Sequence, residues 1–116
     1  MSSITIYQKP TCTTCRRVHS VLKEAGIDFV AVNYYTDPLS KNKLKSLLKK
    51  MGMPAADLLR KKEPLYKKLG LAGKKLSEEK LIDLMVRYPD LIERPIVEKG
   101  DRALLARPAD SISRIL

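Results

Sequence analysis

The residues best suited to chemistry are two cysteines, Cys12 and Cys15, separated by two threonines near the start of the chain. The side chains of residues 4–7 alternate in character as they do in a short strand, and apolar side chains recur at helical spacing over residues 18–25. Cys12 is therefore expected where the strand passes into the helix, at or before the first turn. The free N–H groups and the positive dipole end of a helix favour a thiolate there. The sequence thus predicts a nucleophilic Cys12 near neutral pH.

The residues that follow Cys12 have more than one interpretation. Cys15 lies one helical turn further on, as either a resolving thiol or a small side chain packed under the helix. Arg16 and Arg17 are expected to face solvent, with a minor electrostatic effect on Cys12. His19 is expected on the solvated side of the helix and not in catalysis. Two cysteines and one histidine are too few for a four-ligand zinc site in one chain, so no metal is expected.

Length and composition indicate one domain in a reducing compartment. The chain has 116 residues, 44% of them hydrophobic, enough for a real core. No apolar run approaches the roughly 18 residues of a membrane-spanning helix, and the start of the chain lacks the features of a signal peptide. We therefore expect a cytoplasmic protein with no membrane partner. A Cys-x-x-Cys motif there favours redox or catalytic use over a structural disulfide.

The charge balance favours anionic ligands. Lys and Arg number 23 against 13 Asp and Glu, a formal net charge of +10, which attracts anions from small oxyanions to nucleic acids. Many of the lysines occur as pairs beside leucines at helical spacing. This pattern is typical of the solvated faces of helices. Aromatic residues make up 5% of the chain and tryptophan is absent, so stacking platforms for single-stranded nucleic acid are scarce. Nucleic-acid binding as the main function is disfavoured.

The order of expected elements indicates an α/β fold. Gly26 ends the first helix, and a strand at 27–32 completes a βαβ unit with parallel strands. Serine-capped and proline-started helices are then expected at 40–51, 54–60, 63–70 and 77–87. The last third predicts an antiparallel hairpin and a closing helix, at 93–98, 103–106 and 109–116.

This order, β-α-β, a helical insertion at about 38–90, then β-β-α, is that of a thioredoxin-type fold with a mixed four-stranded sheet. In such a fold the Arg94-Pro95 bond occupies the place of a cis-proline whose backbone faces the Cys-x-x-Cys motif. X–Pro bonds are cis in only about 5% of cases, so this expectation depends on the topology.

Four features of the chain together resemble the arsenate reductase (ArsC) family. They are Cys12 just after the first strand, Arg60, the Glu-Arg-Pro-Ile-Val segment at 93–97 and the Ala-Arg-Pro turn at 106–108. The family belongs to the thioredoxin-like superfamily, which also includes the Spx regulators. The similarity covers essentially the whole chain, and it implies a single thioredoxin-fold domain over residues 1–116.

The resemblance implies that Cys12 attacks arsenate and that Arg60, Arg94 and Arg107 hold the oxyanion and the thiol–arsenic adduct. Arginine suits this role because its planar fork pairs with tetrahedral oxyanions, and a helix N-terminus adds backbone donors. The implied sequence is thiolate attack, loss of water and attack of a second thiol on the adduct, which releases arsenite and leaves a disulfide. Gln8 stands where family enzymes tend to carry His or Asn; its amide can donate to the thiolate but carries no charge.

Two assignments remain open at the level of sequence. Family members coupled to glutaredoxin generally take the second thiol from glutathione, whereas here Cys15 can resolve the adduct and leave a Cys12–Cys15 disulfide. Thioredoxin or glutaredoxin would then restore the dithiol, with no bound cofactor. The alternative is an Spx-like redox switch in which the Cys12–Cys15 state alters binding to RNA polymerase. We expect a monomer in either case.

Overall fold

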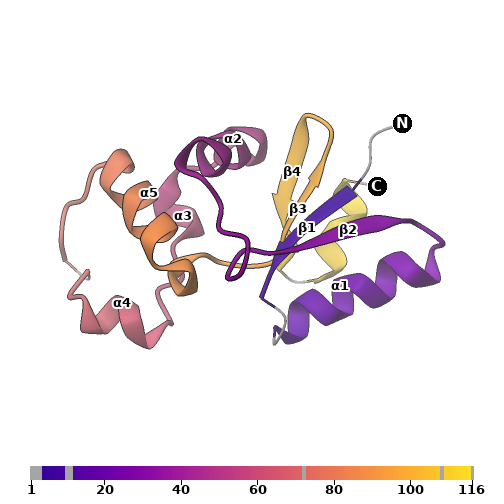
Figure 1. Ribbon diagram of the computed structural model, residues 1–116, viewed down its shortest axis with the longest axis horizontal. Helices are drawn as coiled ribbons and strands as arrows, with labels where there is room; N and C mark the ends of the chain where they lie inside the picture. Colours follow the sequence, from indigo (N-terminus) through magenta and orange to yellow (C-terminus); the bar gives the residue numbers. More distant parts are fainter. Residues whose placement is uncertain (1–3, 10–11, 72, 108, 116) are drawn as a thin grey trace. The chain divides into compact units, whose positions relative to one another are not determined.

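The computed structural model (Figure 1) describes residues 4–9, 12–71, 73–107 and 109–115. The chain forms two compact units. Met1–Asp37 and Arg94–Leu116 make up the first, and Pro38–Glu93 make up the second. The second unit occupies the part of the chain where the sequence predicts a helical insertion. That both units form one domain stays a prediction, and Pro108 of the Ala-Arg-Pro turn lies outside the described residues.

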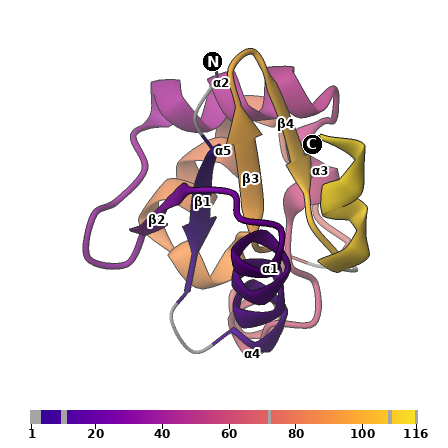
Figure 2. The same cartoon turned by 90° about the vertical axis from the view of Figure 1, so that its right-hand side faces the viewer.

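The first unit contains a four-stranded mixed sheet of order β2-β1-β3-β4 (Figure 2). Its strands are β1 (Ile4–Gln8), β2 (Phe29–Asn33), β3 (Ile96–Lys99) and β4 (Arg102–Leu105). β1 runs parallel to β2 and antiparallel to β3, and β3 pairs with β4 as a hairpin. This topology is thioredoxin-like, so the predicted α/β fold is confirmed. The Arg94–Pro95 bond is cis, as predicted.

Helix α1 (Thr13–Glu24) follows β1 and covers the sheet with its apolar side. Cys15, Val18 and Leu22 are buried on that side. The core of the unit joins α1 to β1, β3 and the C-terminal segment, through Ile4, Ile6, Val18, Leu22, Val97, Ala106, Ala109, Ile112 and Ile115. The helix is followed by its C-cap residue Ala25 and then by Gly26, whose φ of +69° is that of the predicted glycine stop.

The C-terminal segment differs from the prediction of a regular helix over 109–116. Ala109–Arg114 form a 3₁₀ helix, η2. The reason lies in the spacing of the apolar side chains, because Ala109, Ile112 and Ile115 are all buried and recur every three residues. A helix of three residues per turn puts such a row on one side, whereas an α-helix would rotate it away from the core.

The second unit is helical, as predicted for this part of the chain. It contains α2 (Lys41–Met51), α3 (Ala55–Leu58), α4 (Pro64–Lys68), α5 (Glu78–Arg87) and the 3₁₀ turn η1 (Pro89–Leu91). Ser40 and Ser77 cap α2 and α5, accepting hydrogen bonds from backbone N–H groups three residues later, as the sequence predicts. Within the described ranges, no helix is long and apolar enough to cross a membrane.

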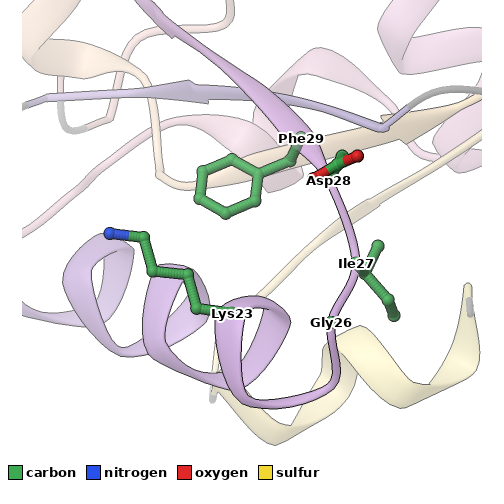
Figure 3. Close-up of a pocket in the computed structure, with 5 residues that line it drawn as sticks. All are labelled: Lys23, Gly26, Ile27, Asp28 and Phe29. Atoms are coloured by element: carbon green, nitrogen blue, oxygen red, sulfur yellow. The ribbon is translucent and has the colours of Figure 1, made fainter.

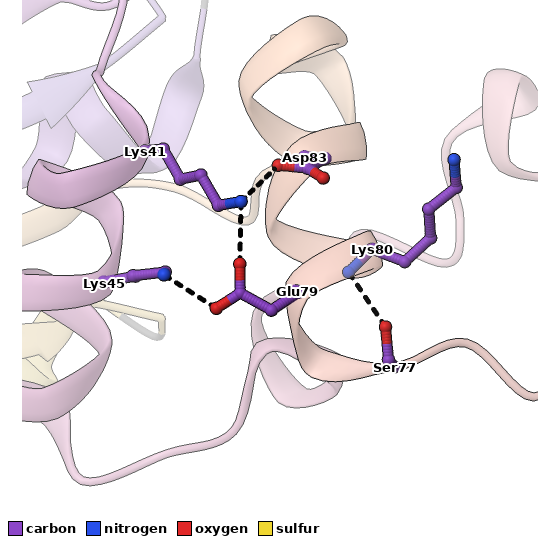
Figure 4. A network of polar contacts seen from close by, with 6 residues as sticks. All are labelled: Lys41, Lys45, Ser77, Glu79, Lys80 and Asp83. Carbon is purple, nitrogen blue, oxygen red and sulfur yellow. Dashed lines mark hydrogen bonds and ion pairs between the residues drawn. The ribbon is translucent and has the colours of Figure 1, made fainter.

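A group of ion pairs joins α2 to α5 (Figure 4). Lys41 Nζ lies 2.7 Å from Glu79 and 3.0 Å from Asp83, and Lys45 Nζ lies 2.7 Å from Glu79. The hydrogen bond from Lys41, and then that from Lys45, lowers the pKa of Glu79 to about 2. Part of the basic charge is therefore balanced inside this unit, between partly exposed side chains.

The core of the first unit sets the position of α1, and Leu22 tests it. Leu22 is fully buried, so Leu22→Ala is expected to lower the free energy of unfolding by about 2–5 kcal/mol. Urea denaturation followed by circular dichroism measures the loss. Glu24→Ala, an exposed change two residues away, should stay within about 0.5 kcal/mol. A loss below about 1 kcal/mol for Leu22→Ala would contradict this packing.

Candidate active site

Cys12 is the N-cap residue of α1, as its position in the sequence predicts. Its Sγ accepts a hydrogen bond of 3.3 Å from the backbone N–H of Cys15, and its own N–H donates to the carbonyl of Lys9 at 3.0 Å. The sulfur thus takes the place of the oxygen that usually caps a helix. Cys12 is 8% exposed, so its thiol is largely buried but still reaches solvent.

The surroundings of Cys12 favour its thiolate. Burial raises its pKa, but hydrogen bonds from the side chain and backbone of Cys15 lower it, as do the charges of Arg94 and Arg107. The net pKa of Cys12 lies below the usual range of a thiol. The structure therefore supplies the physical conditions for the nucleophile that the sequence predicts.

Cys15 has the opposite character. It is 1% exposed on the buried side of α1. Burial, followed by its hydrogen bond to Cys12 and the charge on Cys12, raises the pKa of Cys15 to about 12. Cys15 is thus a thiol that donates its proton to the Cys12 sulfur, and both cysteines are free of a disulfide. Packing under the helix, one of the two sequence interpretations, describes its position here, and its use as a resolving thiol stays a prediction.

Arg94 and Arg107 meet beside the cysteines because the β3–β4 hairpin brings the two ends of their segment together. The Ala106 N–H donates to the Pro95 carbonyl at 2.9 Å, and Arg107 Nη1 donates to the Arg94 carbonyl at 2.9 Å. Arg107 is exposed, whereas Arg94 is only 6% exposed. Two predicted anion ligands and the nucleophile thus come from three separate segments of the first unit.

The Arg94 guanidinium is incompletely satisfied. Among the residues that the structure describes, no group accepts a hydrogen bond from Arg94 Nε or Nη1, although both atoms are buried. Buried polar atoms almost always have a partner, and a buried cation without one is costly. These N–H donors lie within electrostatic reach of the Cys12 sulfur. An oxyanion bound beside the sulfur would accept hydrogen bonds from them.

Arg60 belongs to the second unit. It follows α3 by two residues rather than ending it, and its N–H donates to the Leu91 carbonyl at 2.7 Å. Its Nε lies 3.8 Å from the Glu63 carboxylate, too far for a hydrogen bond, and has no other partner among the described residues. That Arg60 joins the anion site stays a prediction.

Gln8 forms a side-chain pair that the sequence did not indicate. It is buried at the end of β1, and its Oε1 is hydrogen-bonded to His19 Nε2. His19 also packs against the Phe29 ring at 4.8 Å between centroids. His19 is half-buried, so the predicted solvated position holds only in part, and burial, with the charge of Lys23, lowers its pKa. The signal was present: His19 is four residues from Cys15, so the two share a helix face.

Tyr34 is a second residue that sequence reasoning missed. It is 1% exposed, so burial raises its pKa, and the charge of the nearby Arg94 offsets part of that rise. Its position could have been inferred from the βαβ unit, since β1 and β2 are parallel and Gln8 aligns with Asn33. The residues after these two strands, Lys9 and Tyr34, therefore emerge at the same edge of the sheet.

The described residues also form two hollows. One of about 360 Å³ is formed at the end of α1 by Lys23 and residues 26–29 (Figure 3). Lys23 lies roughly 16 Å along the helix from Cys12, at about 1.5 Å per residue. Another, of about 310 Å³, lies in the second unit, lined by Ala56, Leu59, Lys61, Tyr66, Leu71, Lys74, Lys75, Leu76 and Leu81. Within the described residues, no cluster of three or more His, Cys, Asp or Glu could hold a metal ion.

A thioredoxin-like sheet with a helix-capping cysteine and two adjacent arginines defines a thiol-based protein suited to anions. Comparison with known proteins makes the class specific. The model of the ArsC family matches residues 7–115, and the chain belongs to that family.

Individual relatives agree with this assignment. An arsenate reductase of Escherichia coli K12 is 37% identical over 100% of this chain and 82% of its own length. The uncharacterized protein YfgD of the same organism is 42% identical over 97% of this chain and 96% of its own. Among solved structures, an arsenate reductase from Vibrio cholerae has a TM-score of 0.93 at 34% identity, covering 99% of this chain and 98% of that one. None of these findings favours the alternative of an Spx-like regulator.

The coupling between the two thiols gives a direct test of the site. Iodoacetamide should alkylate Cys12 with a pH midpoint below the usual thiol range, since only the thiolate reacts and its pKa is lowered. Cys15 should remain unmodified up to about pH 10 in the folded protein because its pKa is raised to about 12. In Cys12→Ser the pKa of Cys15 should fall, because the anion that raises it is gone. Peptide mass spectrometry after timed alkylation measures all three, and alkylation of Cys15 ahead of Cys12 would refute this arrangement.

Proposed function

We propose that this protein is an arsenate reductase, a thiol-dependent oxidoreductase that reduces arsenate to arsenite. The observation that carries the proposal is the buried Arg94, whose unpartnered nitrogens lie near a cysteine of lowered pKa. The related arsenate reductases of similar length support the choice of substrate. The finer assignments below, of residue roles, reductant and compartment, are part of the same proposal.

The reaction begins with attack of the Cys12 thiolate on the arsenic of a bound arsenate. An S–As(V) bond forms and one arsenate oxygen leaves as water after taking up protons. A second thiolate then attacks the Cys12 sulfur, so that an S–S bond forms and the electron pair of the S–As bond passes to arsenic. Arsenic is reduced from As(V) to As(III), arsenite leaves, and two thiols have become one disulfide. An external dithiol restores the starting state.

The arginines hold the anion through these steps. Arg94 and Arg107 lower the pKa of Cys12, and the same charges attract arsenate and balance the charge that develops on its oxygens. Arg60 is proposed as a third ligand of the anion, as the family resemblance implies. Gln8 is proposed as an uncharged donor near the anion, held in orientation by its bond to His19.

Cys15 is proposed as the second thiol. Its pKa is raised by burial and by the hydrogen bond and charge of Cys12. When Cys12 is bonded to arsenic, the last two of these causes are removed, so Cys15 becomes more acidic only after the adduct exists. Its 1% exposure protects it from outside thiols in the meantime. Thioredoxin or glutaredoxin then reduces the Cys12–Cys15 disulfide, in a reducing, cytoplasmic setting.

Arsenate-dependent oxidation of NADPH tests the function and identifies the reductant. The purified protein is assayed with thioredoxin and its reductase, and separately with glutathione, glutaredoxin and glutathione reductase. Turnover is expected for the wild type and is expected to vanish in Cys12→Ser. Cys15→Ser should lose thioredoxin-coupled turnover and keep activity only where glutathione replaces the missing thiol. Absence of arsenate-dependent oxidation with both systems would overturn the proposal.

Arg94→Ala tests the anion site. Loss of one preorganised donor typically costs about 2–4 kcal/mol of transition-state stabilisation, a fall in kcat/KM of roughly 30- to 1,000-fold. Steady-state kinetics with the active reductant measures it. Arg17→Ala removes an equal charge from an exposed position on α1 and should change kcat/KM less than threefold. A loss below threefold for Arg94→Ala would remove Arg94 from the site.

A further inference from the structure

The ring of Tyr35 lies under a cation from the segment that leads to Cys12. The Lys9 ammonium is 5.2 Å from the centroid of this ring, within the distance of about 6 Å at which an aromatic face attracts a cation. Both residues are half-buried. Lys9 directly follows β1, and Tyr35 is the second residue after β2, which runs parallel to β1. The contact therefore joins the residues that leave two neighbouring strands at the same edge of the sheet.

Tyr35 is itself held in place from two sides. Asn33 Oδ1 accepts a hydrogen bond of 3.0 Å from the Tyr35 N–H, and the Asn33 carbonyl accepts from the N–H groups of Thr36 and Asp37 at 3.2 and 2.9 Å. An asparagine that bonds to the backbone two residues on closes a turn by itself. The Tyr35 ring also packs against that of the buried Tyr34, with centroids 5.2 Å apart and planes tilted by 32°. Tyr35 thus offers Lys9 a fixed ring.

The backbone of Lys9 is bonded to the nucleophilic residue. The Lys9 carbonyl accepts a hydrogen bond of 3.0 Å from the Cys12 N–H. Cys12 has an extended backbone, with φ of −76° and ψ of 121°, and in that conformation its sulfur accepts the Cys15 N–H at 3.3 Å. A contact that restrains Lys9 therefore also restrains the residue whose sulfur caps α1.

An aromatic ring is well suited to anchor a lysine beside this site. A carboxylate would also hold the ammonium, as Glu79 holds Lys41 and Lys45 in the second unit. Beside Cys12, however, a negative charge would disfavour the thiolate and repel an anionic substrate. A tyrosine ring attracts the cation through its quadrupole and adds no net charge.

We propose that Tyr35 is a positioning residue of the active site, whose ring holds Lys9 and, through the Lys9 carbonyl, keeps Cys12 in the conformation that caps α1. The inference rests on the proposed function only where turnover is measured. Hydrogen exchange of the Cys12 amide and alkylation of its thiol report on the same contact without turnover.

Four variants test the contact. Tyr35→Leu removes the ring, Tyr35→Phe keeps the ring without its hydroxyl, and Lys9→Met keeps the apolar stem of the lysine without its charge. Tyr88→Leu is the matched control, because Tyr88 carries another ring near a cation, 5.6 Å from the Arg87 guanidinium, in the second unit. The measurements are amide hydrogen exchange by NMR, the pH midpoint of Cys12 alkylation by iodoacetamide, and kcat/KM for arsenate.

In Tyr35→Leu the Cys12 amide is expected to exchange about three- to tenfold faster, the size expected for losing one partly buried cation–π contact. The alkylation midpoint should move to higher pH, because a less restrained Cys12 is capped for less of the time, and kcat/KM should fall about threefold or more. Tyr35→Phe should match the wild type, since the ring remains. Lys9→Met should accelerate exchange as Tyr35→Leu does, and the double variant should add little to either single change. Tyr88→Leu should leave exchange and alkylation of Cys12 within twofold.

The outcomes separate this inference from the proposed function. A Tyr35→Leu protein that matches Tyr88→Leu in exchange and alkylation of Cys12 overturns the role of Tyr35. Fully additive effects of Tyr35→Leu and Lys9→Met overturn it as well, as does a Tyr35→Phe protein as impaired as Tyr35→Leu. If the wild type fails to reduce arsenate but exchange and alkylation follow the expectation, Tyr35 keeps its role at a reactive cysteine and the arsenate assignment is wrong.

Discussion

The hydrogen bond from the Cys15 N–H to the Cys12 sulfur is the contact on which the site depends. It fixes the sulfur at the end of α1, where the helix dipole favours an anion. The helix in turn is held by the core beneath it, through Val18 and Leu22. A cysteine displaced by one residue in either direction would lose the cap and turn its sulfur away from the arginines. The packing of an ordinary helix therefore determines the chemistry at its first residue.

Connectivity supplies the rest of the site from distant parts of the sequence. Arg94 and Arg107 are thirteen residues apart but meet because one precedes β3 and the other follows its antiparallel partner β4. Tyr34 arrives from the loop after β2, which is parallel to β1 and emerges at the same edge. Three loops thus converge at one end of the sheet, and no cleft between elements is required to bring the charges together.

Much of this arrangement could be predicted from the sequence. The apolar spacing after Cys15, the glycine stop and the final hairpin gave α1 and the sheet order, and the ArsC-like segments pointed to Cys12 and Arg94. Side-chain pairs were harder. The pairing of Gln8 with His19, and the approach of Tyr34 to Arg94, depend on which residues share an edge or a face in three dimensions. The 3₁₀ form of η2 was missed because three-residue spacing over six positions is too short to distinguish from an α-helix in advance.

The partners of the charged groups differ between the two units in a way that bears on function. Lys41 and Lys45 of the second unit are paired with Glu79, and their hydrogen bonds lower the pKa of Glu79 to about 2. Around Cys12 the partner of the thiolate is neutral instead, because Cys15 keeps its proton and donates it to the Cys12 sulfur. Neutral partners orient an ion without cancelling it. A site that must receive an anion needs positive charge that is not already paired, and in the first unit two nitrogens of the buried Arg94 have no hydrogen-bond partner among the described residues.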